Sequence, residues 1–476
     1  MNAAESFRQR LQDAWQAPFF QTIDDQVYTY GDTWCTALAI CRSWRAQGLE
    51  AGSVIALRSS NSFDLPCFYL ACLAGGYIAC PVVPGLHENT VRQNLETVNP
   101  ALVLDRLNAG IVRAEGAPEP ESLAAIDEHR AFLIMFSSGS TGRNKAICHR
   151  FESVAGSAQA FAKQSGFDEN TRLYHVLPMT YMAGFLNAML AVMMAGGKVI
   201  EGPQFSMQTV ADFWSRPLAT DANILSMIPP LAAAVCRMTR DPEKIRQVSR
   251  QFGIVQCTSQ SIQADLRQRF LEKFNLPLRD CYGMTELGGP LSIQSAADAL
   301  ALNEFSDPLP GLEIEIRDGG ELWIRSPWTM LGYLDGGNLT SPVDDRGFLD
   351  TGDLALRENS RIRITGRVKD IVIRGGINTS PARIESMMST MPAISEVAVV
   401  GLPHAFWGEE LVACVVPSAD HPAPSDTGAI LQWCRSHLDS HEVPDRIVYM
   451  TALPRSFIGK VLKRDLVTQL NQATAT

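Results

Sequence analysis

Apolar and polar residues alternate along the first part of the chain in a way that predicts strands and helices in turn. Residues 33–47 have the spacing of a helix, and the run at 53–58 is typical of a strand. An apolar helix at 67–74 leads into a second strand-like run at 77–83. The same alternation resumes over 131–292. Such a pattern favours parallel sheets whose faces are covered by helices.

Half-exposed strands and a smaller unit are expected in the rest of the chain. The segments 312–325 and 360–365 alternate apolar and polar residues, as strands with one solvated face do. Polar residues at 367–370 then separate them from a unit of the size of a small α+β domain. The elements expected in that unit are strands at 397–400 and 411–416 and a helix at 430–438.

Length and charge narrow the class of protein. A chain of 476 residues exceeds one ordinary hydrophobic core, so two or more domains are expected. The net charge of −10 argues against nonspecific binding of nucleic acid, which depends on neutralising phosphates. The eleven cysteines include no C-x-x-C pair and no zinc spacing with histidine. This scattered set favours reduced thiols in the cytoplasm.

Membrane insertion is not expected. Residues 1–16 are polar with mixed charges and lack the apolar region of a signal peptide. The best candidate span, residues 65–83, is interrupted by two prolines and two glycines, so a core helix followed by a strand is favoured. The oligomeric state stays open, and a homodimer is compatible with the sequence.

A stretch of glycines and hydroxyl residues, closed by a lysine, follows directly on the apolar run 131–136. This pattern predicts a buried strand that ends in a tight loop. Glycines let the backbone approach a ligand, and hydroxyls and a lysine add donors and charge, so the loop suits polyphosphate oxygens. It is not the P-loop, because its glycines are too close together and no Ser or Thr follows Lys145. A flexible polar linker is the alternative. The residues expected to contact phosphate are Ser137, Ser138, Gly139, Ser140, Thr141, Gly142 and Lys145.

Four further motifs follow. They read Tyr-Gly-Met-Thr-Glu at 282–286, Gly-Phe-Leu-Asp-Thr-Gly-Asp-Leu at 347–354, Gly-Arg-Val-Lys-Asp at 366–370 and Pro-Arg-Ser-Phe-Ile-Gly-Lys at 454–460. With the loop, and in this order, they resemble the motifs of the AMP-forming adenylating superfamily, which contains acyl-CoA synthetases, stand-alone adenylation domains and luciferases. The chain is most similar to acyl- or aryl-CoA ligases, and the resemblance covers nearly all of it.

The resemblance implies an α/β fold in two parts. A large N-terminal domain at 1–366, with several subdomains and helix-covered sheets, would bind ATP and the acyl group. A hinge at 367–370, centred on Lys369, would lead to a small mobile α+β domain at 371–476 that carries the catalytic lysine. Members of the superfamily rotate the small domain between two half-reactions, and a hinge residue need only absorb a change of backbone conformation.

The implied reaction joins a carboxylic acid to ATP, giving acyl-AMP and pyrophosphate, after which a thiol displaces AMP. Because an anion approaches a polyanion, the site needs cations and aligned donors near the α-phosphate. The resemblance gives this catalytic role to Lys460; the alternative is a solvated lysine. It implies that Glu286 holds Mg²⁺, a hard cation that prefers oxygen ligands. A carboxylate favoured by a helix start is the alternative for Glu286.

Other motif positions are implied to hold the nucleotide. Thr285 matches the donor to the α-phosphate, and Tyr282 matches the residue that packs against adenine. Asp353 and Arg367 match the groups that bind the ribose hydroxyls, with a capping role as the alternative for Asp353. The remaining expected nucleotide contacts are Ser259, Gln260 and Gly283.

Two segments place the acyl pocket. Residues 177–184 resemble the lining segment of 4-coumarate-CoA ligases, where a histidine usually stands at the place of Tyr181. Ala183 occupies the place of the aspartate that binds the ammonium group in amino-acid-activating domains, which disfavours an α-amino acid substrate. Thr258 and Cys281 stand where coumarate ligases have glycine, so we expect a shorter or more polar pocket and a short or compact acid. The residues expected to line the pocket are Tyr181, Ala183, Asn187, Thr258, Cys281 and Met284.

Four residues depart from the usual pattern. Asn144 replaces a proline, Ala146 a glycine, Asp350 an arginine and Arg383 a glutamate. Asp350 matters most for electrostatics, because it trades a cation for an anion near a nucleotide site. The expected catalytic and nucleotide-binding residues are all retained, so we expect a working adenylating enzyme that uses ATP and Mg²⁺.

The thiol acceptor is left open. Gly375 and Gly376 lie in a segment that resembles the pantetheine tunnel of CoA ligases, but coenzyme A and phosphopantetheinyl carrier proteins present the same arm. We expect coenzyme A as the acceptor. The nearest alternative is a stand-alone enzyme that loads a separate acyl or aryl carrier protein in a biosynthetic pathway. An alternative of another class is a non-catalytic sensor of an acid or acyl-AMP, and luciferase-type oxygenation is a remote third.

Overall fold

The structure is a computed structural model of the chain. It describes residues 2–107, 110–116, 126–138, 144–203, 207–260, 262–374, 377–404, 408–418, 427–456 and 459–474.

A seven-stranded sheet contains the first predicted strands and the stem of the glycine-rich loop. Its strand order is β18-β17-β7-β6-β4-β3-β5. The strands β3, β4, β5 and β6 run parallel, whereas β6 and β7 form an antiparallel hairpin around the loop. The bounds are β3 Val54–Arg58, β4 Ile78–Val82, β5 Leu102–Leu104, β6 Ala131–Ser138, β7 Asn144–Arg150, β17 Gly332–Asp335 and β18 Asn338–Thr340.

A nine-stranded sheet, with order β14-β13-β12-β11-β10-β8-β9-β1-β2, forms the second large layer. Its central strands from β1 to β12 are parallel, and antiparallel strands flank them at both edges. The bounds are β1 Pro18–Gln21, β2 Val27–Thr29, β8 Arg172–His175, β9 Lys198–Glu201, β10 Ile224–Met227, β11 Ile254–Thr258, β12 Leu278–Met284, β13 Gly289–Ile293 and β14 Asp307–Pro308.

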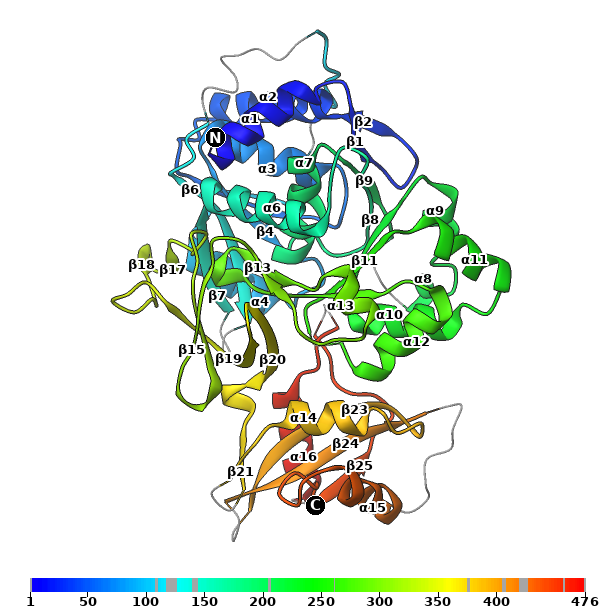
Figure 1. Cartoon of the computed structure of the whole chain (residues 1–476). Coiled ribbons are helices and arrows are strands. Elements are labelled where there is room, and N and C mark those ends of the chain that lie inside the picture. Colours follow the sequence, from blue (N-terminus) through cyan, green and yellow to red (C-terminus); the bar gives the residue numbers. More distant parts are fainter. Residues whose placement is uncertain are drawn as a thin grey trace.

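Helices cover both large sheets, as the alternating pattern predicts (Figure 1). The helix predicted at 33–47 begins at Tyr30, because Thr29 and Asp32 form a reciprocal capping box at its first turn. The bounds are α1 Ala3–Asp13, α2 Tyr30–Ala46, α3 Asp64–Gly75, α4 Glu88–Val98, α6 Phe151–Ser165, the π-helix η1 Ala183–Leu190, α7 Ala191–Ala195, α8 Met207–Val210, α9 Ser215–Ala219, α10 Pro229–Met238, α11 Pro242–Gln251, α12 Ala264–Phe274, the 3₁₀ helix η2 Thr285–Leu287 and α13 Ala296–Leu300.

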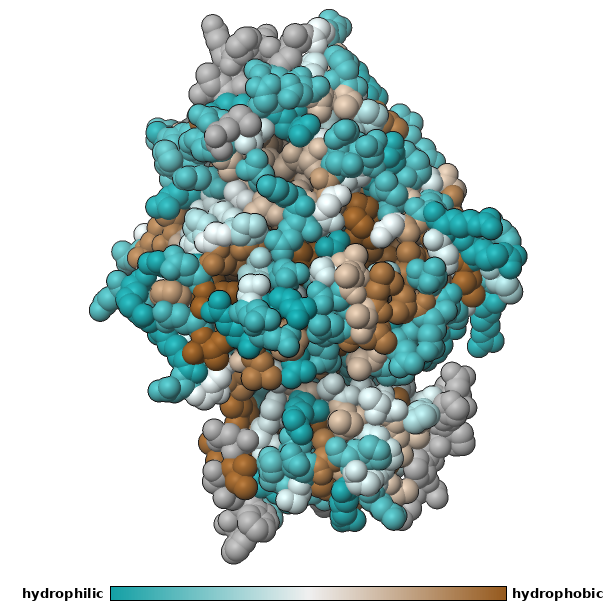
Figure 2. All heavy atoms as spheres, viewed as in Figure 1, coloured by the Kyte–Doolittle hydropathy of each residue, from teal (hydrophilic) through white to brown (hydrophobic). Residues whose placement is uncertain are grey.

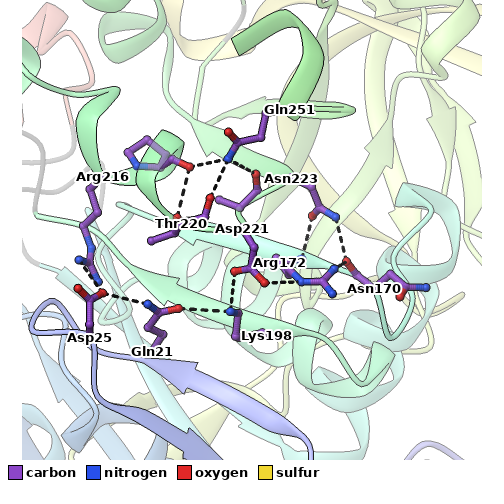
Figure 3. Close-up of polar contacts among 12 residues, drawn as sticks. Gln21, Asp25, Asn170, Arg172, Lys198, Arg216, Thr220, Asp221, Asn223 and Gln251 are labelled. Atoms are coloured by element: carbon purple, nitrogen blue, oxygen red, sulfur yellow. Dashed lines mark hydrogen bonds and ion pairs between the residues drawn. The ribbon is translucent and has the colours of Figure 1, made fainter. Parts of the chain in front are cut away.

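Within this sheet, a polar network links β1 to β8, β9 and the segment before β10 (Figure 3). The Asp221 carboxylate contacts Lys198 Nζ and Arg172 Nε, each at 2.6 Å. Lys198 Nζ also donates to Gln21 Oε1 on β1 at 3.3 Å. These contacts join side chains of separate strands, with Arg172 and Lys198 at the starts of β8 and β9.

Two smaller sheets complete the chain. A four-stranded sheet of order β15-β16-β19-β20 precedes residues 368–370, and a five-stranded sheet in which β23 and β24 pair over most of their length follows them. The latter and its helices form the small domain at the bottom of Figure 1. The bounds are β15 Glu313–Ile316, η3 Asp318–Gly320, β16 Glu321–Arg325, β19 Leu349–Glu358, β20 Arg361–Arg367, η4 Val368–Asp370, β21 Val372–Arg374, β22 Ile377–Thr379, α14 Pro381–Met388, β23 Ile394–His404, β24 Gly408–Pro417, α15 Thr427–His437, β25 Arg446–Tyr449 and α16 Lys463–Thr474.

The expected α/β fold, with a large N-terminal part and a small C-terminal part, is confirmed. Sheet membership changes at η4, and we place the domain boundary there. Among the described helices, none has both the length and the apolar character needed to cross a bilayer.

Candidate active site

Asp353 is the centre of a polar cluster next to the hinge. Its Oδ2 accepts a hydrogen bond from the Tyr282 hydroxyl at 2.7 Å, and its Oδ1 accepts one from Arg367 Nε at 2.7 Å. The register of β19 and β20 sets this pair, because Asp353 lies directly opposite Arg367. Burial, followed by the nearby carboxylate of Asp353, raises the pKa of Tyr282, so the phenol stays a hydrogen-bond donor. The three residues expected to contact adenine and ribose are thus in contact.

Lys460 lies in a tight loop of the small domain. Ser456 N donates to Lys460 O at 2.8 Å, and Gly459 N donates to Ser456 O at 2.8 Å. Gly459 has a φ of 79°, a conformation that suits glycine. The Arg455 side chain also donates to Gly459 O at 2.6 Å, and it forms an ion pair of 2.7 Å with Glu396 on β23. Arg455 therefore ties the lysine loop to the sheet of its own domain.

The same loop rests on the large domain. A Cβ built on Gly459 would lie 3.1 Å from Ile228 Cδ1 and 3.4 Å from Pro230 Cγ, at the start of α10. Figure 1 shows the segment that precedes α16 rising from the small domain toward this helix. The absence of a side chain at Gly459 lets the loop approach α10 this closely.

This contact brings Lys460 to the Asp353 cluster. Burial lowers the pKa of Lys460, and the charges of Arg367 and Lys369 lower it further, while Asp353 and Asp370 oppose the shift. The charges that act on the ammonium group thus come from β19 and from residues 367–370. Lys460 of the motif at 454–460 and Asp353 of the motif at 347–354 thus influence each other although they are far apart in the sequence.

A second cluster joins the predicted metal-binding residue to the phosphate-loop lysine. The Tyr333 hydroxyl on β17 donates to Glu286 Oε1 at 3.2 Å, and Lys145 Nζ lies 4.4 Å from the centre of the Tyr333 ring. His149 Nε2 on β7 lies 2.8 Å from Thr285 O. Burial lowers the pKa of His149 to about 4, so the ring is neutral at pH 7 and donates to that carbonyl. Tyr333 of β17 and His149 of β7 thus hold the Thr285–Glu286 turn against the seven-stranded sheet.

The stem of the phosphate loop is well defined. Ser137 lies opposite Lys145 in the β6–β7 hairpin. Asn144, which departs from the usual proline, donates from Nδ2 to Asn94 Oδ1 of α4 at 3.1 Å. At this position the hydrogen bond of Asn144 to α4 replaces the rigidity that a proline ring would give. The expected phosphate contacts Gly139, Ser140, Thr141 and Gly142, and the side chain of Ser138, lie outside the described residues.

Two further expected nucleotide contacts have unusual backbone surroundings. Ser259, after β11, has a φ of 79°, which is rare for a residue with a side chain. A Cβ on Gly283 would lie 2.3 Å from Gly289 O, so only glycine fits between β12 and β13 at this point. Gln260 follows Ser259 and is half-buried.

Three of the expected acyl-pocket residues meet in the core. Asn187 Nδ2 of the π-helix η1 lies 3.6 Å from Cys281 Sγ, and Thr258 Oγ1 donates to Cys281 O at 3.2 Å. Burial raises the pKa of the Cys281 thiol to about 12, which favours a wall residue over a nucleophile. π-Helical turns are rare and occur often at functional sites.

The other expected pocket residues pack into neighbouring parts of the structure. Met284 packs with Tyr282 against a core formed by β13, β16 and β19, and Ala183 packs against the core beneath α10 and α12. Tyr181 is half-buried, and its burial raises the pKa of its phenol. The structure therefore joins Asn187, Thr258 and Cys281 but does not bring Met284 to them.

Lys369 and two of the three remaining departures, Asp350 and Arg383, have the following surroundings. Lys369 is exposed in the 3₁₀ helix η4. Asp350 Oδ1 accepts from Gly352 N at 2.8 Å, so this carboxylate caps its own turn. Arg383 pairs with the buried Glu442 at 2.6 Å and serves the small domain. The expected tunnel residues Gly375 and Gly376 lie outside the described residues.

Sequence reasoning missed His149, Tyr333 and Arg455. A lone polar residue in the apolar run 146–149 is the only signal for His149. Arg455 lies within a recognised motif but carries no signal of its ion pair. Tyr333 has no local signal, because its contacts depend on how β17 pairs with β7.

Comparisons with known proteins identify the family of the chain. Residues 7–334 match the family described as AMP-binding enzyme, and residues 383–460 match the AMP-binding enzyme C-terminal domain. A long-chain-fatty-acid–CoA ligase, FadD13 of Mycobacterium tuberculosis, is 28% identical over 89% of both chains. The mitochondrial malonate–CoA ligase ACSF3 of Mus musculus is 25% identical over 93% of this chain and 86% of its own.

Solved structures share the fold. ATP-bound MatB from Rhodopseudomonas palustris superposes with a TM-score of 0.85 at 23% identity, covering 98% of this chain and 99% of its own. The apo form of the same protein has a TM-score of 0.76 over the same coverage. The motifs, the two family matches and the shared fold lead to one conclusion: this chain is a member of the AMP-binding enzyme family.

Proposed function

We propose that this protein activates a carboxylic acid with ATP to form acyl-AMP and pyrophosphate, and then transfers the acyl group to coenzyme A. The observation that supports the proposal is the electrostatic influence on Lys460, which belongs to the small domain, of Arg367 and Asp353, which are paired with each other. Named relatives that are CoA ligases align over most of the chain and support it.

The first half-reaction follows from the charges at this junction. Asp353 and Arg367 would bind the ribose hydroxyls, which leaves the α-phosphate on the side of Lys460. The Lys460 ammonium would then lie between the acid carboxylate and the α-phosphate and stabilise the charge that develops as the carboxylate oxygen attacks phosphorus and pyrophosphate leaves. Thr285 would donate to the same phosphate, and Lys145 would neutralise the leaving group.

Mg²⁺ fits the residues near Glu286. Among the described residues, no group of three metal-ligating side chains is present. Mg²⁺ on a nucleotide needs only one or two protein carboxylates, because phosphates and water complete its octahedron. Glu286, oriented by Tyr333, would supply that carboxylate. When bound, the ion would neutralise phosphate charge.

The second half-reaction requires another arrangement of the small domain. Ile373 and Ile377, on the β21–β22 hairpin, are 53% and 50% exposed, and Val368 in the hinge is 37% exposed. Figure 2 shows brown, apolar residues gathered around this junction of the two domains. An exposed apolar hairpin beside a hinge supports a rotation that would bury it against the large domain. In the sequence, the predicted thiol-tunnel glycines fall between Arg374 and Ile377.

The test is acid-dependent release of pyrophosphate with ATP and Mg²⁺, over a panel of aryl, short-chain, long-chain and amino acids. The wild-type protein should respond to one acid class, and Lys460→Ala should lose the response. If no acid stimulates release, or if Lys460→Ala equals wild type, the assignment fails and a sensor becomes the better account. Supplying coenzyme A or a purified carrier protein as acceptor then separates the two thiol alternatives.

A further inference from the structure

A row of polar side chains crosses one face of the nine-stranded sheet. Leu173, Ile224 and Ile254 on neighbouring strands pack into the core that includes η1 and α6. Because side chains alternate along a strand, the residue two positions later on each strand lies on the same face. These residues are polar and buried, and with their neighbour on β12 they make up the polar row: His175, Ser226, Gln256 and Arg279.

Two members of the polar row are already bonded within the fold, although Nδ1 of His175 has no partner among the described residues. His175 Nε2 lies 2.9 Å from Gly184 O, and burial lowers the pKa of His175 to about 4, so it is neutral at pH 7. Arg279 donates to Gln294 O at 2.8 Å and to Ser165 O at 2.9 Å, at the C-terminal turn of α6. The guanidinium is therefore directed at backbone carbonyls and not at the sheet face.

Gln256 is different. Its side chain is 1% exposed, and neither its Oε1 nor its Nε2 has a hydrogen-bond partner among the described residues. The Oδ1 of Asn187, which is 4% exposed, also has no such partner, although its Nδ2 contacts Cys281. Buried polar atoms in native proteins nearly always have a partner. Two neutral amides on facing elements thus offer donors and acceptors that the described chain does not use.

These amides lie on the acyl side of the site. Gln256 precedes Thr258 by two residues on the same face of β11, and Thr258 contacts Cys281, to which Asn187 is also bonded. Cys281 is followed by Tyr282, which binds Asp353. The Asn187–Thr258–Cys281 cluster therefore lies between Asp353, which is expected to bind the nucleotide, and Gln256.

We infer that the substrate acid carries a neutral hydrogen-bonding group, such as a carboxamide or hydroxyl, at the end far from its carboxylate, and that Gln256 and Asn187 select for it. This inference rests on the proposed adenylation function. A purely apolar end would leave both amides without partners, which is costly when they are buried. A second carboxylate would have to compete for the Arg279 guanidinium with the backbone carbonyls that already accept its hydrogen bonds.

An isosteric series tests the inference. Succinamate, succinate, levulinate and 4-methylpentanoate share one skeleton and end in a carboxamide, carboxylate, acetyl or isopropyl group. The 3-substituted benzoates with the same four ends repeat the series on an aromatic scaffold. We expect kcat/KM for pyrophosphate release to be at least about tenfold higher for the carboxamide than for the isopropyl or carboxylate member of the preferred scaffold.

Variants identify the residues responsible. Gln256→Leu and Asn187→Leu should each reduce the carboxamide-to-isopropyl ratio of kcat/KM by about tenfold, with the KM for ATP unchanged. Thr33→Val is the matched control, because it removes a fully buried hydroxyl of α2 that bonds only its own helix turn. The thermal midpoint of Gln256→Leu should equal or exceed that of wild type, since an orphan polar group is removed.

The outcomes distinguish failure of this inference from failure of the proposed adenylation function. Activity with a preference for the apolar or dicarboxylate member overturns the inference and leaves adenylation intact, and so does an unchanged ratio in both variants. A fall of the Gln256→Leu midpoint by more than about 5 °C shows that Gln256 serves the fold, which also overturns it. If no acid in either series or in the broad panel releases pyrophosphate, adenylation itself fails.

Discussion

The phenol of Tyr333 donates to Glu286 Oε1 at 3.2 Å while the face of the same ring lies against the Lys145 ammonium, 4.4 Å from the ring centre. A single side chain on β17 therefore positions both the carboxylate proposed for Mg²⁺ and the lysine of the phosphate loop. Groups that orient a metal ligand commonly influence metal affinity as strongly as the ligand does.

Removing only this hydroxyl should weaken Mg²⁺ binding. Tyr333→Phe keeps the ring and its contact with Lys145 but frees the Glu286 carboxylate. We expect the Mg²⁺ concentration for half-maximal pyrophosphate release to rise about tenfold, measured at saturating ATP and acid. Tyr77→Phe is the control, because the Tyr77 hydroxyl bonds Leu49 O, remote from the site. An unchanged Mg²⁺ curve for Tyr333→Phe would show that the hydroxyl does not orient Glu286.

Arg455 should act as a positioning residue for Lys460. Arg455→Ala removes both the hydrogen bond to Gly459 O and the ion pair with Glu396. We expect kcat for adenylation to fall about tenfold with little change in KM for the acid, because the loss concerns the placement of the ammonium. Arg446→Ala breaks a similar ion pair of 2.8 Å with Glu410 in the same domain and should leave kcat unchanged. Equal effects of both variants would point to general destabilisation.

The activity should decline on the alkaline side earlier than an ordinary lysine would predict. Burial and the neighbouring cations lower the pKa of Lys460 below the usual 10.5. The charged ammonium is the active form, so activity is present at lower pH and is lost as the pH rises through the lowered pKa. The pH profile of kcat/KM reports this group in the free enzyme. Lys460→Arg should lack this alkaline limb, because a guanidinium stays charged; an identical limb in that variant would assign it to another group.

The Asp221 network should make stability depend on pH. Burial alone would raise the pKa of Asp221, but the hydrogen bond from Lys198 and the charges of Lys198 and Arg172 outweigh it and lower this pKa below 3.8. The stabilisation is therefore present above about pH 4 and is lost as the pH falls through the lowered pKa. At pH 7, Asp221→Asn should lower the thermal midpoint by about 1–3 °C, and the difference from wild type should shrink below about pH 4. Asp439→Asn, which breaks an exposed pair at 3.4 Å, should change little at either pH.

Local sequence patterns predicted the strands and helices well, because the periodicity of each depends on residues close together in the sequence. The motif residues Lys145, Glu286, Asp353 and Lys460 were also accessible, since each lies in a short stretch of distinctive composition. Sequence alone could not supply the partners that join them. Tyr333 reaches Glu286 through the pairing of β17 with β7, and Gln256 meets the acyl side through the register of parallel strands. Both contacts depend on the packing of segments far apart in the sequence, and the residues next to Tyr333 and Gln256 give no signal of them.

The reactivity of the Lys460 amine should report whether the two domains are in contact. The loop at Gly459 rests on Ile228 and Pro230 of the large domain, and parting of the domains would expose the half-buried Lys460 that follows it. An amine reagent added in pulses would therefore modify Lys460 slowly when the domains are engaged and quickly when they part. The labelling rate of a single side chain would then follow the position of the small domain through a catalytic cycle, with no probe added to the protein.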